Sequence, residues 1–92
     1  MILSFKCKDT EKLSRGVRVR RFASIEKIVR RKLRQLDIAA QLGDLRVPPG
    51  NCLEGLSDDR SNQYSIRINN RWRICFHWTA AGAINVEIAD YH

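Results

Sequence analysis

The chain ends on three side chains that can exchange protons or bind a phosphate: Asp90, Tyr91 and His92. A fourth candidate, Arg73, lies in an alternating apolar and polar segment upstream. Histidine titrates near neutral pH, arginine can hold two phosphate oxygens, and tyrosine can stack on a base. These types predict RNA binding, or metal-free RNA cleavage in which the substrate's 2′-hydroxyl attacks the phosphate. The alternative is that Tyr91 closes the core and the other two terminal residues are only solvated.

Positive charge is concentrated in the first half of the sequence. The 92 residues carry a formal net charge of +7. Residues 1–50 contain 13 Lys and Arg against 5 Asp and Glu, whereas residues 51–92 contain 4 against 5. This asymmetry predicts a polyanionic partner for the first half, and the alternative is an ordinary soluble basic surface.

Length and composition favour one folded domain over residues 1–92 in the cytoplasm. No run approaches the roughly 18 apolar residues of a membrane span, and the first residues lack the pattern of a signal peptide. The three cysteines, Cys7, Cys52 and Cys75, contain no C-x-x-C spacing and leave one over after any pairing. They fit reduced thiols better than a disulfide framework or a zinc site. We expect no metal, no cofactor and no membrane contact.

The order of predicted elements is typical of an α+β fold. Residues 2–5 predict a short strand with Leu3 and Phe5 on one face, and Asp9 or Thr10 can cap a brief helix that ends near Gly16. Residues 15–21 predict an exposed loop. Ser24 is the predicted N-cap of the main helix, over residues 24–40. Strands are predicted over residues 63–68, over 72–78 and from 84 onward, and they form an antiparallel meander.

The main helix has an apolar stripe and a basic remainder. The stripe, at helical spacing, consists of Ile25, Ile28, Val29, Leu33, Leu36 and Ala40. Glu26 is the single acid near the basic residues, so most of the pairs that would neutralise them are missing. An anion-binding surface is therefore predicted from four residues of this helix and two that precede it: Lys27, Arg30, Arg31, Arg34, Arg20 and Arg21.

The alternation within the strands predicts their pairing. The apolar faces of the first two strands can be buried together only if Ile68 pairs with Trp72, which sets Arg67 opposite Arg73. A carboxylate or a bound phosphate would relieve this repulsion, so Arg67 is a further predicted RNA contact. The last strand is predicted to bury Ile84, Val86 and Ile88, and Tyr91 falls on the same face as Arg73 if that strand is adjacent.

Several segments together resemble the HigB-type toxins of the RelE/ParE superfamily of bacterial toxin–antitoxin systems. The likeness covers essentially the whole chain, and its motifs are Leu53-x-x-Leu56, Arg60, Tyr64-Ser65-Ile66-Arg67-Ile68-Asn69, Trp72-Arg73-Ile74-Cys75-Phe76 and Val86-Glu87-Ile88-Ala89-Asp90-Tyr91-His92. Leu45-Arg46 followed by Pro48-Pro49-Gly50-Asn51 is similar to the GraT branch. The Trp-Arg-Ile and terminal Asp-Tyr-His elements are quite specific, whereas the basic helix is not.

The resemblance implies a compact sheet with two N-terminal helices packed on one face. It implies a ribosome-dependent endonuclease that cuts mRNA in the A site, with Arg73 stabilising the phosphate and with Asp90, Tyr91 and His92 orienting the RNA and handling protons. The basic residues would then contact RNA or the ribosome. It further implies neutralisation by a helix-turn-helix, HigA-like antitoxin, with operator DNA bound only by the complex. The antitoxin could sit on the basic helix or on the Arg73–Tyr91 face.

Two other functions are compatible with the same residues. One is a ParE-like gyrase poison on the same fold, and the other is a non-catalytic basic module that binds RNA or regulates its operon. The chain also departs from the toxin pattern: relatives often have His at Glu54, Lys at Ser57, and Gly at Asp58 and Asn62. Loss of a cation and gain of acids near the phosphate predict a slower toxin.

Overall fold

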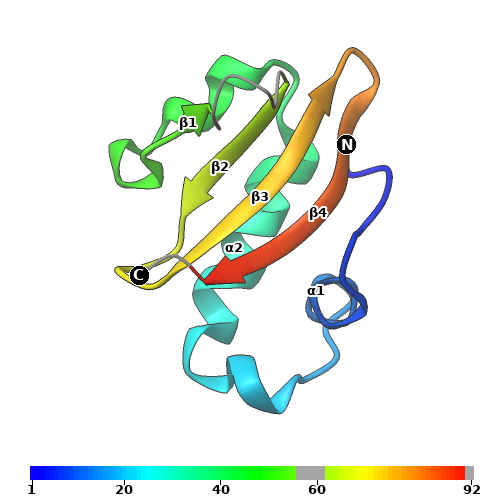
Figure 1. The fold of residues 1–92 in the computed structure, drawn as a ribbon, viewed down its shortest axis with the longest axis vertical. Helices are drawn as coiled ribbons and strands as arrows, with labels where there is room; N and C mark the ends of the chain where they lie inside the picture. Colours follow the sequence, from blue (N-terminus) through cyan, green and yellow to red (C-terminus); the bar gives the residue numbers. More distant parts are fainter. Residues whose placement is uncertain (56–61, 91–92) are drawn as a thin grey trace.

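The computed structural model describes residues 1–55 and 62–90 and confirms the α+β class. Four strands form one antiparallel sheet in the order β1-β2-β3-β4 (Figure 1). The helical elements precede all four strands in the chain. The bounds of the α-helices, the 3-10 helices (η) and the strands are α1 Lys8–Ser14, η1 Arg20–Ile25, α2 Glu26–Ile38, η2 Leu42–Arg46, η3 Pro49–Asn51, β1 Glu54–Gly55, β2 Gln63–Arg67, β3 Trp72–Thr79 and β4 Gly82–Asp90.

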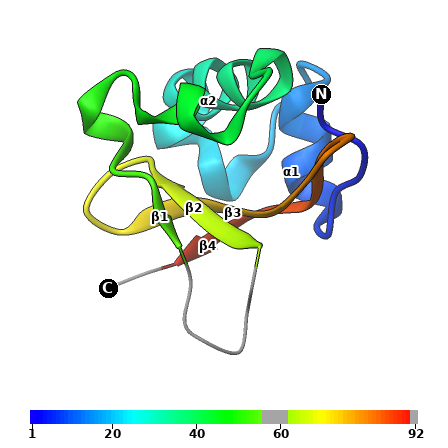
Figure 2. The same ribbon diagram turned by 90° about the horizontal axis from the view of Figure 1, so that it is seen from above.

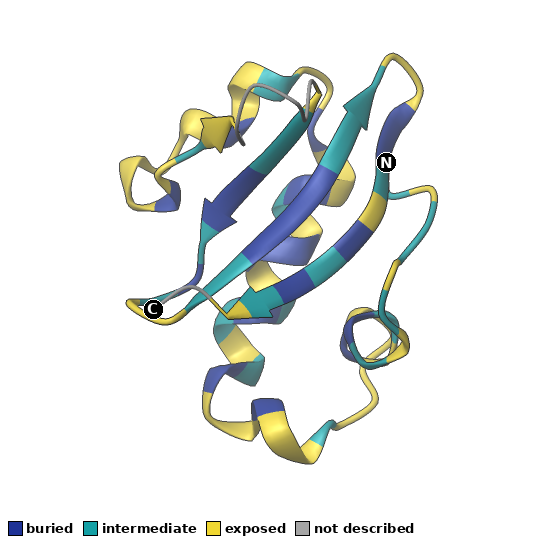
Figure 3. Cartoon of the chain, in the orientation of Figure 1, coloured by how far each residue is buried: buried dark blue, intermediate teal, exposed yellow. Residues whose placement is uncertain are grey.

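The molecule has two layers, with both α-helices on the same face of the sheet (Figure 2). The predicted apolar stripe of α2 is confirmed, because Val29, Leu33 and Leu36 are at most 2% exposed and pack into the core. Figure 3 shows these buried turns of α2 behind the sheet. The opposite face of the sheet carries no helix (Figure 2).

The ends of the helical segments differ from the prediction. Residues 20–25 form the 3-10 helix η1, so α2 begins at Glu26 and Ser24 is not its N-cap. The helix ends at Ile38, and Ala39 rather than Ala40 belongs to the core. In α1, Cys7 occupies the N-cap position without a side-chain capping hydrogen bond. Thr10, a predicted cap, is fully buried and instead accepts a hydrogen bond from the β4 backbone at Ile88, 3.1 Å away.

The predicted pairing of β2 with β3 is confirmed. Arg67 lies opposite Arg73, and Ser65 lies opposite Cys75. The backbone N–H of Ile68 donates to the carbonyl of Trp72 at 2.9 Å, as the predicted three-residue loop requires. The last strand is adjacent to β3, with Arg73 opposite Ala89. The face without helices therefore carries the side chains of Arg67, Arg73, Ser65 and Cys75.

One core residue of the last strand was predicted wrongly. The pairing of β3 with β4 shifts between Cys75 and His77, and Asn85 has a φ of +54° there. This bulge reverses the alternation, because an extra residue in one strand turns the following side chains to the other face. As a result Ala83 is fully buried, whereas Ile84 pairs with His77 and is outside the core.

The N-terminal residues do not form the predicted regular strand. They run along the free edge of β4 and make two isolated parallel bridges, Ile2 to Ala83 and Phe5 to Val86. Ile2 and Phe5 pack against the core, whereas the Leu3 side chain is 46% exposed. No helix in the described part of the chain is long and apolar enough to cross a membrane.

Candidate active site

Arg73 is the best-fixed cation on the helix-free face of the sheet. Its side chain is only 11% exposed. The Nε–H donates to Ser65 Oγ at 2.8 Å, and Nη2 donates to the carbonyl of Cys52 at 2.6 Å and lies 3.4 Å from the carbonyl of Ser65. Ser65 is itself fully buried. The guanidinium is thus held in one orientation, and none of these contacts uses Nη1.

The carbonyl that holds Arg73 belongs to a residue in an uncommon backbone conformation. Cys52 has a φ of +46° where the chain turns from η3 into β1. A left-handed conformation is rare for residues other than glycine and is maintained only when the surroundings enforce it. Asn51, the preceding residue, is fully buried and donates through Nδ2 to the carbonyl of Leu45 at 3.1 Å. This packing fixes the turn and therefore the acceptor for Arg73.

Charges around Arg73 are only partly balanced. Glu54 Oε2 lies 3.9 Å from Arg73 Nη2, but the Glu54 side chain is 64% exposed, so the attraction is weak. Arg67, directly opposite Arg73, donates to Asn70 Oδ1. The predicted repulsion is thus eased by one solvent-exposed carboxylate and one neutral amide. The site keeps positive charge for an anion.

Asp90 lies on a different side of the sheet from Arg73. It pairs with Trp72, a residue that packs against the helix-covered core, so its side chain leaves the strand toward that layer. Its Oδ2 accepts from Arg71 Nε at 3.0 Å, and the Arg71 guanidinium lies over the Trp72 ring. Within the described residues, Asp90 and Arg73 therefore do not form one cluster. Tyr91 and His92 lie outside the described residues, as do Ser57 and Asp58.

The other predicted RNA contacts lie in the helical layer, across the sheet from Arg73 (Figure 2). Arg30 is half-buried: Nη2 is 3.3 Å from Glu26 Oε1, and Nε donates to the carbonyl of Leu13 at 3.3 Å. Arg21 forms an ion pair with Asp9 at 3.1 Å. The remaining four are exposed side chains: Arg20, Lys27, Arg31 and Arg34. The structure thus divides the predicted binding residues between two faces.

One buried cation was missed by the sequence reasoning. Lys32 is only 6% exposed, and its ammonium donates to Asn51 Oδ1. Burial lowers the pKa of Lys32, and the positive charges of Arg31 and Arg67 lower it further. Lys32 therefore links α2 to the turn that holds Cys52. Ser65 and Arg71 were also missed; Ser65 could have been found from its place beside Arg73 in the predicted register.

Comparisons with known proteins show the family of this chain. Residues 6–92 match the family described as the RelE-like toxin of type II toxin–antitoxin system HigB. The chain is 39% identical over 90 residues to Toxin HigB-1 of Vibrio cholerae, covering 96% of this chain and 95% of that protein. It is also 34% identical over 56 residues to an uncharacterized protein of Haemophilus influenzae, covering 61% and 55%. The chain belongs to the HigB-like family and is a toxin of a type II toxin–antitoxin system.

Proposed function

We propose that this toxin is a ribosome-dependent endonuclease that cleaves mRNA in the A site. The observation that carries the proposal is Arg73, which is clamped by Ser65 and Cys52 on the open face of the sheet. A fixed guanidinium needs little reorganisation when charge develops on a phosphate, and preorganisation of this kind accounts for much of electrostatic catalysis. Membership in a RelE-like toxin family supports the same reaction class.

The proposed reaction requires no group beyond the RNA and the protein. The 2′-oxygen loses its proton to a base and attacks the adjacent phosphorus, and the bond from phosphorus to the 5′-oxygen breaks. The leaving oxygen then takes a proton from an acid. Arg73 stabilises the extra negative charge through Nη1, which no described residue engages. Tyr91 and His92 carry the protons, with the individual acid and base left open, and Asp90 orients the end of β4 through its ion pair with Arg71.

Contacts with the rest of the substrate are proposed on both layers. Arg67 lies opposite Arg73 and would contact the RNA backbone near the cleaved bond. The exposed cations of η1 and α2 would contact ribosomal RNA, because a partner as large as the ribosome can reach both faces of so small a domain. The proposed neutralising partner is a helix-turn-helix antitoxin whose complex with the toxin binds operator DNA.

The proposal is tested by inducing the toxin alone and measuring growth and mRNA integrity. We expect Arg73→Ala and deletion of Tyr91 and His92 each to abolish growth inhibition and mRNA cleavage while leaving the circular dichroism spectrum unchanged. Arg73→Lys serves as a matched control that keeps the charge but cannot make the same planar contacts. Unchanged toxicity in both loss variants would refute the proposal. DNA damage with intact mRNA would instead indicate a gyrase poison.

A further inference from the structure

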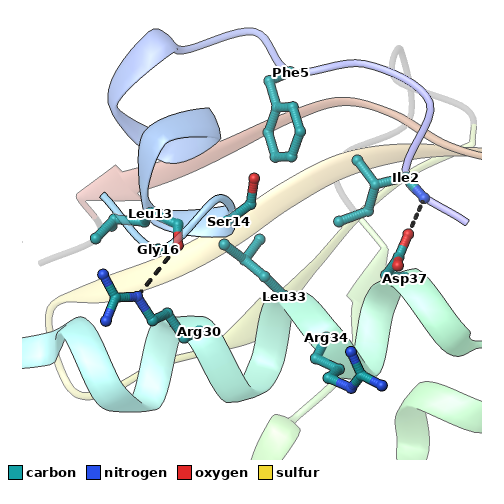
Figure 4. A pocket seen from close by; sticks show the side chains of 9 residues that line it. All are labelled: Ile2, Phe5, Leu13, Ser14, Gly16, Arg30, Leu33, Arg34 and Asp37. Atoms are coloured by element: carbon teal, nitrogen blue, oxygen red, sulfur yellow. Dashed lines mark hydrogen bonds between the residues drawn. The ribbon is translucent and has the colours of Figure 1, made fainter. Parts of the chain in front are cut away.

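A groove in the helical layer lies across the sheet from Arg73, and one of its lining residues, Arg34, is also among the proposed ribosome contacts. It lies between α1, α2 and the N-terminal segment and has a volume of about 400 Å³ (Figure 4). Its apolar lining includes Ile2, Phe5, Leu13 and Leu33. Leu13 and Leu33 are at most 2% exposed, so they belong to the packed core and give the groove a rigid floor.

The N-terminal segment and the last turn of α2 form one end of the groove. There the backbone N–H of Ile2 donates to Asp37 Oδ1 at 2.8 Å, which holds the N-terminal segment against α2 (Figure 4). Ile38, four residues after Arg34 and therefore on the same side of α2, is 67% exposed. Exposed apolar side chains beside an apolar groove are typical of a protein interaction surface.

Three charged residues line the groove: the arginines Arg30 and Arg34, and Asp37, whose Oδ1 accepts from the Ile2 N–H. Arg30 is committed to Glu26 and to the carbonyl of Leu13. Arg34 lies one turn further along α2 and also lines the groove (Figure 4). Within residues 1–55 and 62–90, no residue forms an ion pair or hydrogen bond with Arg34. A ligand of this groove would therefore bring apolar groups for the floor and one negative charge for Arg34.

We propose that this groove docks an amphipathic segment of the antitoxin, with apolar side chains on the floor and a carboxylate against Arg34. The inference rests on the proposed partnership with a helix-turn-helix antitoxin. A protein segment fits better than RNA, because nucleic-acid sites combine several unpaired cations with aromatic platforms. Here one cation is free of partners among the described residues, and Phe5 is the one aromatic residue that lines the groove. This segment would leave the Arg73 face uncovered.

The inference is tested by binding between purified toxin and purified helix-turn-helix antitoxin. All toxin samples carry Arg73→Ala, so that they can be produced without their antitoxin. We expect Arg34→Glu and Ile38→Glu each to weaken binding by at least about tenfold, because each sets a negative charge against the proposed carboxylate. Arg34→Lys and Ile38→Lys keep a positive charge and should weaken binding by less than their Glu counterparts.

Matched variants separate docking in the groove from general attraction of charge. Arg20→Glu also reverses an exposed cation of the helical layer, but Arg20 does not line the groove, and we expect a change within about threefold. Affinity within about twofold of the parent for both folded Glu variants would overturn the inference, as would an equal loss in Arg20→Glu. Failure of the antitoxin to bind the parent would overturn it too.

The remaining outcomes distinguish this inference from the proposed reaction. The first outcome is measured in toxin with its native Arg73. If Arg34→Glu abolishes mRNA cleavage but leaves the affinity for the antitoxin unchanged, the groove serves RNA or the ribosome, and the inference is overturned. Groove variants that weaken antitoxin binding while the native toxin cleaves no mRNA would support the docking surface and refute the endonuclease.

Discussion

The hydrogen bond between Ser65 Oγ and Arg73 Nε offers the sharpest test of the clamp. Ser65 is fully buried and the Arg73 side chain is 11% exposed, so water cannot easily replace the lost acceptor in Ser65→Ala. A hydrogen bond to a charged group contributes about 1.5 to 3 kcal/mol, and leaving a charged donor unsatisfied costs at least as much as for a neutral one. We therefore expect Ser65→Ala to lower the free energy of unfolding by about 1.5 to 3 kcal/mol.

A double-mutant cycle isolates this pair from other effects of the substitutions. Urea unfolding of Ser65→Ala, Arg73→Ala and the double variant should give a coupling free energy of about 1.5 to 3 kcal/mol, because Ser65→Ala loses little once the guanidinium is absent. Gln63→Ala is the matched control, since Gln63 lies on the same face of β2 but pairs with His77. It should be additive with Arg73→Ala. A Ser65–Arg73 coupling below about 0.5 kcal/mol would refute the clamp.

Three further predictions concern other parts of the structure. Glu54→Gln should raise the rate of mRNA cleavage by up to about fivefold, because an exposed ion pair such as that of Glu54 with Arg73 is worth at most about 1 kcal/mol. An unchanged or lower rate in single-turnover assays would contradict this prediction. Because the pKa of folded Lys32 lies below the ordinary 10.5, the unfolded chain binds more protons in the alkaline range between the two values. The free energy of unfolding, relative to that of Lys32→Met, should therefore rise as pH increases through that range. Both proteins carry Cys52→Ser, which removes a nearby thiol. A difference in unfolding free energy that falls as pH increases would be inconsistent with a buried cation. Thr10→Val keeps the shape of the side chain but removes the acceptor for the Ile88 N–H. In urea unfolding it should lower the free energy of unfolding by about 1 to 3 kcal/mol. A change below about 0.5 kcal/mol would show that water or another group satisfies that N–H.

Local alternation was sufficient to predict the central hairpin. Only one pairing buries Ile66 and Ile74 together, and that pairing places Arg67 opposite Arg73. The helical spacing of Val29, Leu33 and Leu36 likewise predicted the buried face of α2. Patterns of this kind succeed because burial of one face is a large and repeated free-energy term.

The errors came from features that alternation does not encode. The bulge at Asn85 moved Ile84 off the core, and the one sequence signal for it is the tolerance of asparagine for positive φ. The contact between Arg73 and the Cys52 carbonyl joins residues far apart in sequence and depends on a backbone turn. Such contacts arise from tertiary packing and have no local pattern.

The division of the basic residues between two faces could have been predicted. An apolar stripe that packs on one face of a sheet turns the rest of the helix away from that sheet. Arg31 and Lys27 were placed off the stripe, and Arg73 was placed on the face without core residues. Those two placements together predict that the basic helix and Arg73 lie on opposite sides of the sheet. The alternation along the last strand, which predicts Tyr91 on the face of Arg73, likewise predicts Asp90 on the other face.

The central claim is that Arg73 serves RNA cleavage on the ribosome. The most direct measurement is the mapping of mRNA 5′ ends after induction of the native toxin and of Arg73→Ala. The native toxin should produce new ends at a fixed position relative to the A-site codon of translated messages, and folded Arg73→Ala should produce none. Growth inhibition by the native toxin without such ends, or identical ends from both proteins, would contradict the account.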